Sequence, residues 1–175
     1  MTRVVLWLQR HETQLFRLVN ARSRHAALDY ALNRITHLGG ATATLTVSLA
    51  IALIASGGWS LAGWASFVAV IVSHLPVALI KKLYPRLRPY MVLPETNTGA
   101  KPLKDHSFPS GHSTAIFAAT VPFMTLQPLL AAVLLPVALT VALSRIYLGL
   151  HYPSDCAAGA VIGTITALLA VLAIG

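Results

Sequence analysis

Three short polar segments carry the side chains of this sequence that could do chemistry. "KKLYPRLRP" begins at Lys81, "PSGH" ends at His112, and "SRIYLGLHYPSD" ends at Asp155. Together they hold basic residues, a Ser-Gly pair and two histidines, the second of which lies four residues before an aspartate. Cations and helix N-termini bind phosphate, whereas histidine transfers protons or attacks phosphorus.

The first segment predicts a helix end followed by a loop. Pro85 interrupts the helix, and Pro89 holds the residue before it in an extended conformation. Lys81 would then lie at the helix end and Arg88 in the loop. An arginine offers a planar fork that matches phosphate oxygens, and a lysine offers a point charge. Alternatively, both are cations that snorkel at a membrane boundary.

The second segment predicts the start of a helix at Ser110 and Gly111. The first N–H groups of a helix lack partners and, with the helix dipole, favour a bound anion. Gly111 would let this backbone approach the anion closely. His112, in the first turn, could protonate a leaving oxygen. An ordinary cap by Ser110, with His112 at the interface, is the open alternative.

The third segment pairs a histidine with an acid. Asp155 could accept a hydrogen bond from one imidazole nitrogen of His151 and leave the other lone pair free to attack. Arg145 lies one to two turns from its helix end, deep enough to need an anion. The alternative is a surface histidine beside a capping aspartate.

The elements that position these segments are membrane helices. Of the 175 residues, 56% are hydrophobic and only 10% are charged, and the mean hydropathy is +0.71. Soluble domains carry about 25% charged residues. We therefore expect an all-α, polytopic transmembrane helical bundle that forms one domain over residues 1–175. Blocks long enough for a span of roughly 20 residues predict five spans, at 38–56, 59–80, 110–126, 128–150 and 154–175.

Residues 1–38 predict one or two amphipathic helices that lie in the membrane interface, with the transmembrane catalytic core at 38–175. Several arginines interrupt the apolar run there, among them Arg3, Arg10 and Arg17. A charge at the bilayer centre costs about 3 kcal/mol on insertion scales, which excludes an ordinary span for this segment. Whether residues 1–38 nevertheless contain a sixth span stays open.

Short connections between the spans place the three polar segments on one membrane face. The loops near Gly57 and Gln127 are too short for anything but antiparallel neighbours. The second span ends, the third begins, the fourth ends and the fifth begins on the same side. Three cations, a helix N-terminus and two histidines would therefore meet there, which is a set that fits phosphoryl transfer through a phosphohistidine.

The net charge of +8 fits this interpretation better than nucleic-acid binding. The basic residues cluster near the ends of apolar runs, at Lys81, Lys82, Arg86, Arg88, Lys101, Lys104 and Arg145. That placement favours an anionic group bound at the membrane surface. The single cysteine, Cys156, excludes an intramolecular disulfide.

Other polar residues are weaker candidates. His74 lies inside the second span, where an ionisable residue is a functional candidate by default. A neutral histidine bonded to a neighbouring helix is the simpler interpretation. Asp105 borders the second segment and is interpreted as a residue that solvates the loop, although it could contact substrate.

The three segments resemble the type 2 phosphatidic acid phosphatase (PAP2) superfamily, in its bacterial membrane lipid phosphatase branch. "KKLYPRLRP" fits the family's K-x6-R-P pattern, "PSGH" is identical to its second pattern, and "SRIYLGLHYPSD" fits S-R-x5-H-x3-D. The motifs are complete and in order, from Lys81 to Asp155. Membrane members of the family usually have six spans, against the five counted here.

The resemblance implies a role for each residue. Lys81, Arg88 and Arg145 would hold the phosphate, with hydrogen bonds from Ser110 and Gly111. His112 would protonate the leaving group, His151 would be the nucleophile, and Asp155 would orient it. No metal and no other cofactor is implied.

The implied function is a metal-independent lipid phosphate or diphosphate phosphatase in the cell (inner) membrane, with its site on the extracytoplasmic face. Its partners would be the membrane and a lipid substrate such as undecaprenyl diphosphate, phosphatidylglycerophosphate or phosphatidic acid, and not nucleic acid. The motifs do not rank these lipids, and the oligomeric state is not readable. The alternatives are a vanadate-dependent haloperoxidase-like enzyme and a non-catalytic membrane anion carrier.

Overall fold

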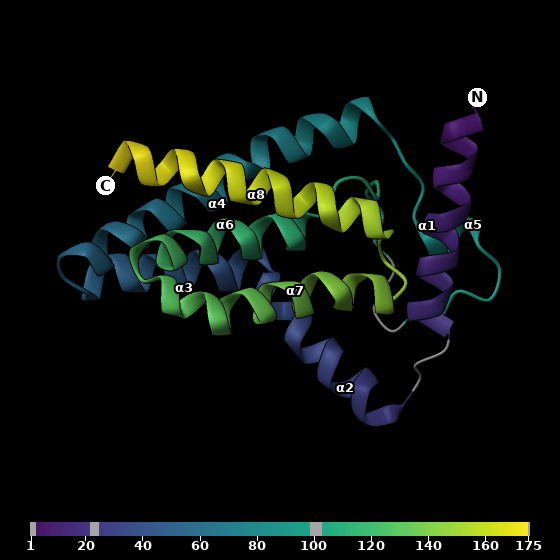
Figure 1. Ribbon diagram of the computed structural model, residues 1–175, viewed down its shortest axis with the longest axis horizontal. Helices are drawn as coiled ribbons and strands as arrows, with labels where there is room; N and C mark the ends of the chain where they lie inside the picture. The colour runs from purple at the N-terminus through teal and green to yellow at the C-terminus, as the bar shows by residue number, and fades with distance from the viewer. Residues whose placement is uncertain (1–2, 22–24, 99–102, 175) are drawn as a thin grey trace.

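The computed structural model describes residues 3–21, 25–98 and 103–174, and the part of the chain it describes contains helices and no strands. Figure 1 shows a helical bundle with α1 lying across one end. In chain order the helices are α1 (Arg3–Ala21), α2 (Ala26–Ile35), the 3-10 helix η1 (Thr36–Gly39), α3 (Ala41–Ile54), α4 (Gly58–Leu83), α5 (Pro89–Val92), α6 (Gly111–Leu126), the 3-10 helix η2 (Pro128–Leu130), α7 (Ala131–Tyr147) and α8 (Pro153–Ile174).

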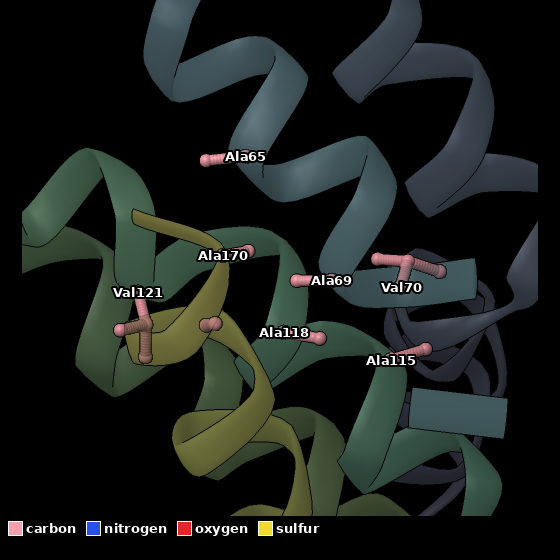
Figure 2. Packing of buried hydrophobic residues seen from close by; sticks show 8 residues of the cluster. Ala65, Ala69, Val70, Ala115, Ala118, Val121 and Ala170 are labelled. Carbon is pink, nitrogen blue, oxygen red and sulfur yellow. The ribbon is translucent and has the colours of Figure 1, made fainter. Parts of the chain in front are cut away.

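Helix α6 lies at the centre of the bundle and packs against α4, α7 and α8 (Figure 1). The core between α4, α6 and α8 consists almost entirely of alanine and valine side chains (Figure 2). Small residues let helix backbones approach closely, and close packing is what holds helices together where lipid removes the hydrophobic driving force. The members of this core are Ala65, Ala69, Val70, Ala115, Ala118, Val121, Ala167 and Ala170.

Two glycines bring α8 into direct contact with the backbone of α6. A Cβ on Gly159 would lie 2.5 Å from the carbonyl oxygen of Ser110, and one on Gly163 would lie 2.3 Å from that of Thr114. The two glycines are four residues apart, so they share a face of α8 in the G-x3-G spacing of membrane helix pairs. This contact fixes the first turn of α6 against the first three turns of α8.

The predicted helical bundle is confirmed, whereas the number of spans stays a prediction. By length and composition three helices can cross a membrane: α4, α8, and α7 together with η2. The predicted span at 38–56 corresponds to α3, which has only 14 residues because Gly40 begins it late. The predicted span at 110–126 is α6, whose 16 residues extend about 24 Å at 1.5 Å per residue.

Helices α2 and α3 pass the span test only as a pair. They are bent by 56° at the break around Gly40, which makes them a candidate broken span. The boundary predicted at residue 38 therefore falls within a continuous bent unit of the structure. Whether α2 lies in the interface, as the sequence predicted, stays a prediction.

Helix α1 is amphipathic and packs on the bundle through one face. On that face its Phe16 and Asn20 side chains are buried, while Trp7, Leu15 and Leu18 face outward. The Asn20 amide donates to the carbonyl of Tyr147 at the end of α7. The helix is thus held at the end of the bundle where α7 ends and α8 begins.

Candidate active site

The three polar segments meet at the end of the bundle that α1 crosses. Helix α4 ends at Leu83, and the chain after it is extended at Arg88, with φ −76° and ψ 153°, before Pro89 starts α5. Helices α6 and α8 begin at this end, and α7 finishes there. The predicted placement of Lys81 in a helix and Arg88 in the following loop is confirmed.

Arg88 is the most enclosed cation of the site, with 1% of its surface exposed. Its Nη1 donates to the carbonyl of Leu150 at 2.8 Å and lies 3.1 Å from Nε2 of His151. Its Nε and Nη2 donate to the backbone and the carboxylate of Asp105, each at 2.8 Å. The guanidinium therefore links the first segment directly to the predicted nucleophile.

Lys81 joins the same group through Asp105. Its ammonium forms an ion pair with the carboxylate of Asp105 and donates to the carbonyl of His106 at 3.0 Å. Burial acts to raise the pKa of Asp105, but Lys81 and Arg88 outweigh it and lower this pKa to about 2. The interpretation of Asp105 as a loop-solvating residue is incomplete, because the carboxylate bridges two of the predicted phosphate-binding cations.

His151 lies between an acid and an arginine and is 2% exposed. Its Nδ1 is 3.5 Å from Oδ2 of Asp155 and has no hydrogen-bond partner among the described residues. Burial lowers the pKa of His151 to about 4, an effect that Arg88 and Arg145 reinforce and Asp155 opposes. The imidazole is therefore neutral at pH 7, as a nucleophile requires.

Asp155 is fully buried at the third position of α8. Its Oδ2 accepts the backbone N–H of Tyr152 at 2.8 Å and the hydroxyl of Ser107. The predicted alternative of a capping aspartate is thus correct for Asp155, which receives the N–H at the start of its helix. The companion idea of a surface histidine is wrong, because His151 is enclosed.

The N-terminus of α6 has the features of an anion site. Ser110 is its N-cap and accepts the N–H of Ser113 at 3.4 Å, while its own N–H donates to the carbonyl of Asp155 at 2.9 Å. The N–H groups of Gly111 and His112 have no protein acceptor among the described residues. A Cβ added to Gly111 would meet nothing within 4 Å, so the space beside this turn is open. The N–H of Ser110 is thus used within the protein, and its hydroxyl oxygen also accepts the hydroxyl of Ser113 at 3.1 Å.

His112 and Arg145 complete the predicted set. His112 is in the first turn of α6, within electrostatic range of Arg145, His151 and Arg88. Arg145 is 3% exposed and donates from Nη1 to the hydroxyl of Thr36 at 2.9 Å. Its Nε is buried and has no acceptor in the described part of the chain. A buried guanidinium with an unused donor is a further feature that suits an anion.

The backbone of Arg145 also shapes the loop that carries His151. Its carbonyl accepts the N–H groups of Leu150 at 3.0 Å and His151 at 3.2 Å. Gly149 makes the turn with a φ of 74°, and its Cα lies against the carbonyl of Asn97, where a Cβ would come within 2.6 Å. These constraints end α7 at Tyr147, three residues before the predicted end of the span.

One further cation, Arg86, reaches the site from outside the predicted set. Its Nη1 donates to Oδ1 of Asp155 at 2.8 Å, and its Nη2 donates to Glu12 of α1 at 2.7 Å. Burial acts to lower the pKa of Arg86, but the hydrogen bond to Glu12 and the charges of Asp155 and Glu12 outweigh it and raise this pKa above its usual value. Arg86 is thus a permanent cation beside the buried acid.

All eight predicted site residues therefore lie at one end of the bundle. The residues that sequence reasoning missed, or assigned elsewhere, are Glu12, Thr36, Arg86, Asp105 and Ser107. The one available signal was that Glu12 is one of only two acidic residues, with Asp29, in the otherwise basic segment 1–38. His74 bonds the carbonyl of Val70 in its own helix at 2.7 Å, and not a neighbouring helix as predicted.

Known proteins resemble this chain in both sequence and fold. It is 40% identical over 107 residues to decaprenylphosphoryl-5-phosphoribose phosphatase of Mycobacterium tuberculosis, which covers 60% of this chain and 55% of that one. It is 32% identical over 101 residues to bacitracin transport permease protein BcrC of Bacillus licheniformis, which covers 58% and 50%. The matches thus span about half the length of these relatives.

The crystal structure of Aquifex aeolicus LpxE superposes with a TM-score of 0.83 at 25% identity, over 91% of this chain and 94% of that one. The likeness extends over almost the whole chain. With three helices able to cross a membrane, this identifies the chain as a membrane protein. The PAP2 superfamily profile matches residues 62–175, which contain all three polar segments. The chain belongs to the PAP2 superfamily.

Proposed function

We propose that this protein is an integral-membrane lipid phosphatase that works through a phosphohistidine on His151. The observation that carries the proposal is the placement of His151, a buried neutral histidine with Asp155 beside Nδ1 and Arg88 beside Nε2. The unpaired N-terminus of α6 lies at the same end of the bundle. This arrangement provides a nucleophile, an orienting acid and an anion site in one place.

In this mechanism a phosphate group binds among Lys81, Arg88 and Arg145. The free N–H groups at the start of α6 and the hydroxyl of Ser110 would add hydrogen bonds to its oxygens. Arg88 would turn its Nη1 from Nε2 of His151 to a phosphate oxygen, which releases the lone pair for attack. The cations neutralise the charge that builds up on the transferring group.

The reaction then takes place in two displacements. Nε2 of His151 forms a bond to phosphorus as the bond to the leaving oxygen breaks, and His112 gives that oxygen a proton. Asp155 stabilises the positive charge that the imidazole acquires. Water next attacks phosphorus and gives a proton to His112 as the bond from phosphorus to Nε2 breaks, which releases inorganic phosphate and returns both histidines to their starting forms.

Lipid phosphates or diphosphates are the proposed substrates. The Mycobacterium tuberculosis relative is named as a phosphatase of a decaprenyl-linked phosphate, which supports a substrate with a long apolar chain. Undecaprenyl diphosphate, phosphatidylglycerophosphate and phosphatidic acid remain the candidates. The haloperoxidase alternative is not favoured, because three helices here are long and apolar enough to cross a membrane. The carrier alternative is not favoured either, because binding an anion does not require a neutral histidine placed beside a buried aspartate.

Phosphate release from these three lipids by detergent-purified protein tests the proposal. Release from at least one lipid is expected, as is inhibition by orthovanadate, which can take up the five-coordinate geometry of the transferring group. Activity is expected to persist in EDTA, since cations and a helix N-terminus take the place of a metal. No release from any of the lipids, or activity that EDTA abolishes and Mg²⁺ restores, would contradict the proposal.

The proposed location is the inner membrane with the site on the extracytoplasmic face. A face rich in cations would normally be cytoplasmic, but the substrate accounts for Lys81, Arg88 and Arg145. Thr98 is exposed on the loop at this end. In a Cys156→Ser background, Thr98→Cys should react with an impermeant thiol reagent in intact cells. Labelling only after permeabilisation would place the site in the cytoplasm.

A further inference from the structure

The side chain of Arg86 makes four contacts, none of them with a residue predicted to bind phosphate. Its guanidinium donates to Asp155 and to the hydroxyl of Ser154, both at 2.8 Å, and to Glu12 at 2.7 Å. Its central carbon lies 3.9 Å from the ring centre of Tyr152. A guanidinium held by two carboxylates, a hydroxyl and an aromatic ring has one orientation available to it.

These contacts divide the two oxygens of Asp155 between different tasks. Oδ1 accepts Arg86, whereas Oδ2 lies on the side of His151 and accepts Tyr152 N–H and the Ser107 hydroxyl. A carboxylate bonded on both oxygens cannot rotate about its last bond without losing donors. The donors on the two oxygens together hold Oδ2 toward Nδ1 of His151, and Arg86 is the side chain that binds Oδ1.

Glu12 holds Arg86 in turn and belongs to α1, 74 residues earlier in the chain. Its Oε2 accepts Arg86, while its Oε1 accepts the N–H of Ser154 at 3.0 Å and the hydroxyl of the same residue. Phe16, one turn further along α1, is buried with its ring centre 5.7 Å from that of Tyr152. Helix α1 is thus joined to the first turn of α8 at the level of the active site.

We infer that Arg86, fixed by Glu12 of α1, is a positioning residue that acts on His151 through Asp155. The inference rests on the proposed function and adds to it a support for the nucleophile at a position that the K-x6-R-P pattern leaves unspecified. Because Asp155 is fully buried and the Arg86 side chain is 30% exposed, the arginine also connects the buried pair to the surface helix. Its effect belongs to the chemical step and not to phosphate binding.

The test is a double-mutant cycle on phosphate release from the lipid that the wild type hydrolyses best. Arg86→Gln should lower kcat about 10-fold with KM unchanged. The interaction free energy between two residues in contact commonly corresponds to about that factor. In an Asp155→Asn background the same change should cost less than about twofold, since the group it acts through is gone. Arg86→Lys, which keeps the charge but not the fork, should recover only part of the loss.

Glu12→Gln tests the second link. It should lower kcat by less than Arg86→Gln does. In an Arg86→Gln background, Glu12→Gln should cause no further loss of kcat. Arg10→Gln provides a matched control, because Arg10 is exposed on the same helix. Its kcat should equal that of the wild type. Each variant is compared at equal monodispersity, and thermal unfolding is measured to separate a loss of fold from a loss of rate.

The outcomes distinguish this inference from the proposed function. Wild-type protein without lipid phosphatase activity overturns both. An active wild type with an unchanged Arg86→Gln variant overturns the inference alone. The inference is also overturned if Arg86→Gln lowers kcat by the same factor with Asp155 as with Asp155→Asn. Equal factors would mean that Arg86 acts independently of the acid, as a merely structural residue would. A rise in KM with constant kcat would assign Arg86 to substrate binding instead.

Discussion

The two ends of this bundle are built from different interactions. Between α4, α6 and α8 the contacts are made by alanines, valines and glycines, and the helix backbones nearly touch. Where α6 and α8 begin, buried arginines, a histidine and an aspartate are held by side-chain hydrogen bonds. The apolar part therefore sets the distances between the helices, and the polar end depends on those distances to hold the site together.

The largest effect is expected from removing the nucleophile. His151→Ala should reduce phosphate release by about 10³-fold or more, because no other group can form the covalent intermediate. The loss should be equal for a lipid phosphate and for p-nitrophenyl phosphate. Steady-state rates on both substrates check this. Turnover within tenfold of the wild type on either one would remove His151 from its role.

The second effect concerns the acid and depends on the leaving group. His112→Ala should lower the rate on a lipid phosphate by about 10²-fold, since an alkoxide leaves badly without a proton. p-Nitrophenolate is stable as an anion, so that substrate should lose much less. The ratio of the two losses is the measurement. Equal losses on both substrates would show that His112 does not act as the acid.

The pH profile gives a third, smaller effect at the same end. With the pKa of His151 at about 4, the nucleophile is neutral above that pH and protonated below it. On the acid side, kcat/KM should therefore fall about tenfold for each pH unit below about 4. An acid limb near pH 6.5, the ordinary histidine value, would mean that His151 is more accessible to water than this site allows.

Stability must be followed in the same series. The unfolded chain takes up a proton on histidine near pH 6.5, whereas the folded chain resists protonation of His151 until about pH 4. The unfolded state therefore binds more protons in this window, and stability falls as the pH falls through it. Activity is to be measured only where the protein stays folded.

The smallest effect on rate is expected from the apolar part. Gly63 of α4 lies against α3, and a Cβ there would come within 2.5 Å of the backbone nitrogen of Ala52. Gly63→Ala should destabilise the fold by about 1–3 kcal/mol, as overpacking does, and leave kcat of the folded protein unchanged. Thermal unfolding in detergent and a kcat normalised to folded protein check both parts.

Gly159→Ala is the matching variant at the polar end of the bundle. The same kind of contact occurs there, but the atom it meets is the carbonyl oxygen of Ser110 at the start of α6. Both stability and kcat should fall, because the shift displaces the predicted anion site. If Gly63→Ala lowers kcat as much as Gly159→Ala, the separation between a packing region and a catalytic end is wrong.

Much of the site was predictable because local chemistry specifies it. Pro89 holds Arg88 in an extended conformation whatever the tertiary structure. Ser110 caps a helix, and Asp155 lies four residues after His151. Short loops then bring these segments to one face. Arg86 and Glu12 could not be paired in this way, because they are 74 residues apart and no local pattern selects one partner among several cations.

The span count was less predictable than the site. Hydropathy gives the extent of an apolar run but not where its helix begins, and the run from residue 38 starts its α-helix only at Ala41. The preceding helix then meets it at a 56° bend, which depends on how α2 and η1 pack against α7. Such a bend is a property of tertiary contacts and not of composition.

A rapid-quench experiment with ³²P-labelled lipid phosphate tests most directly whether His151 carries the phosphoryl group. Wild-type protein, quenched in alkali during the first turnover, should contain label that survives alkali, is released by acid and maps to the peptide containing His151. His151→Ala should contain none. Label that resists acid, label on any other residue, or no label at any time across the first turnover would contradict a phosphohistidine at this position.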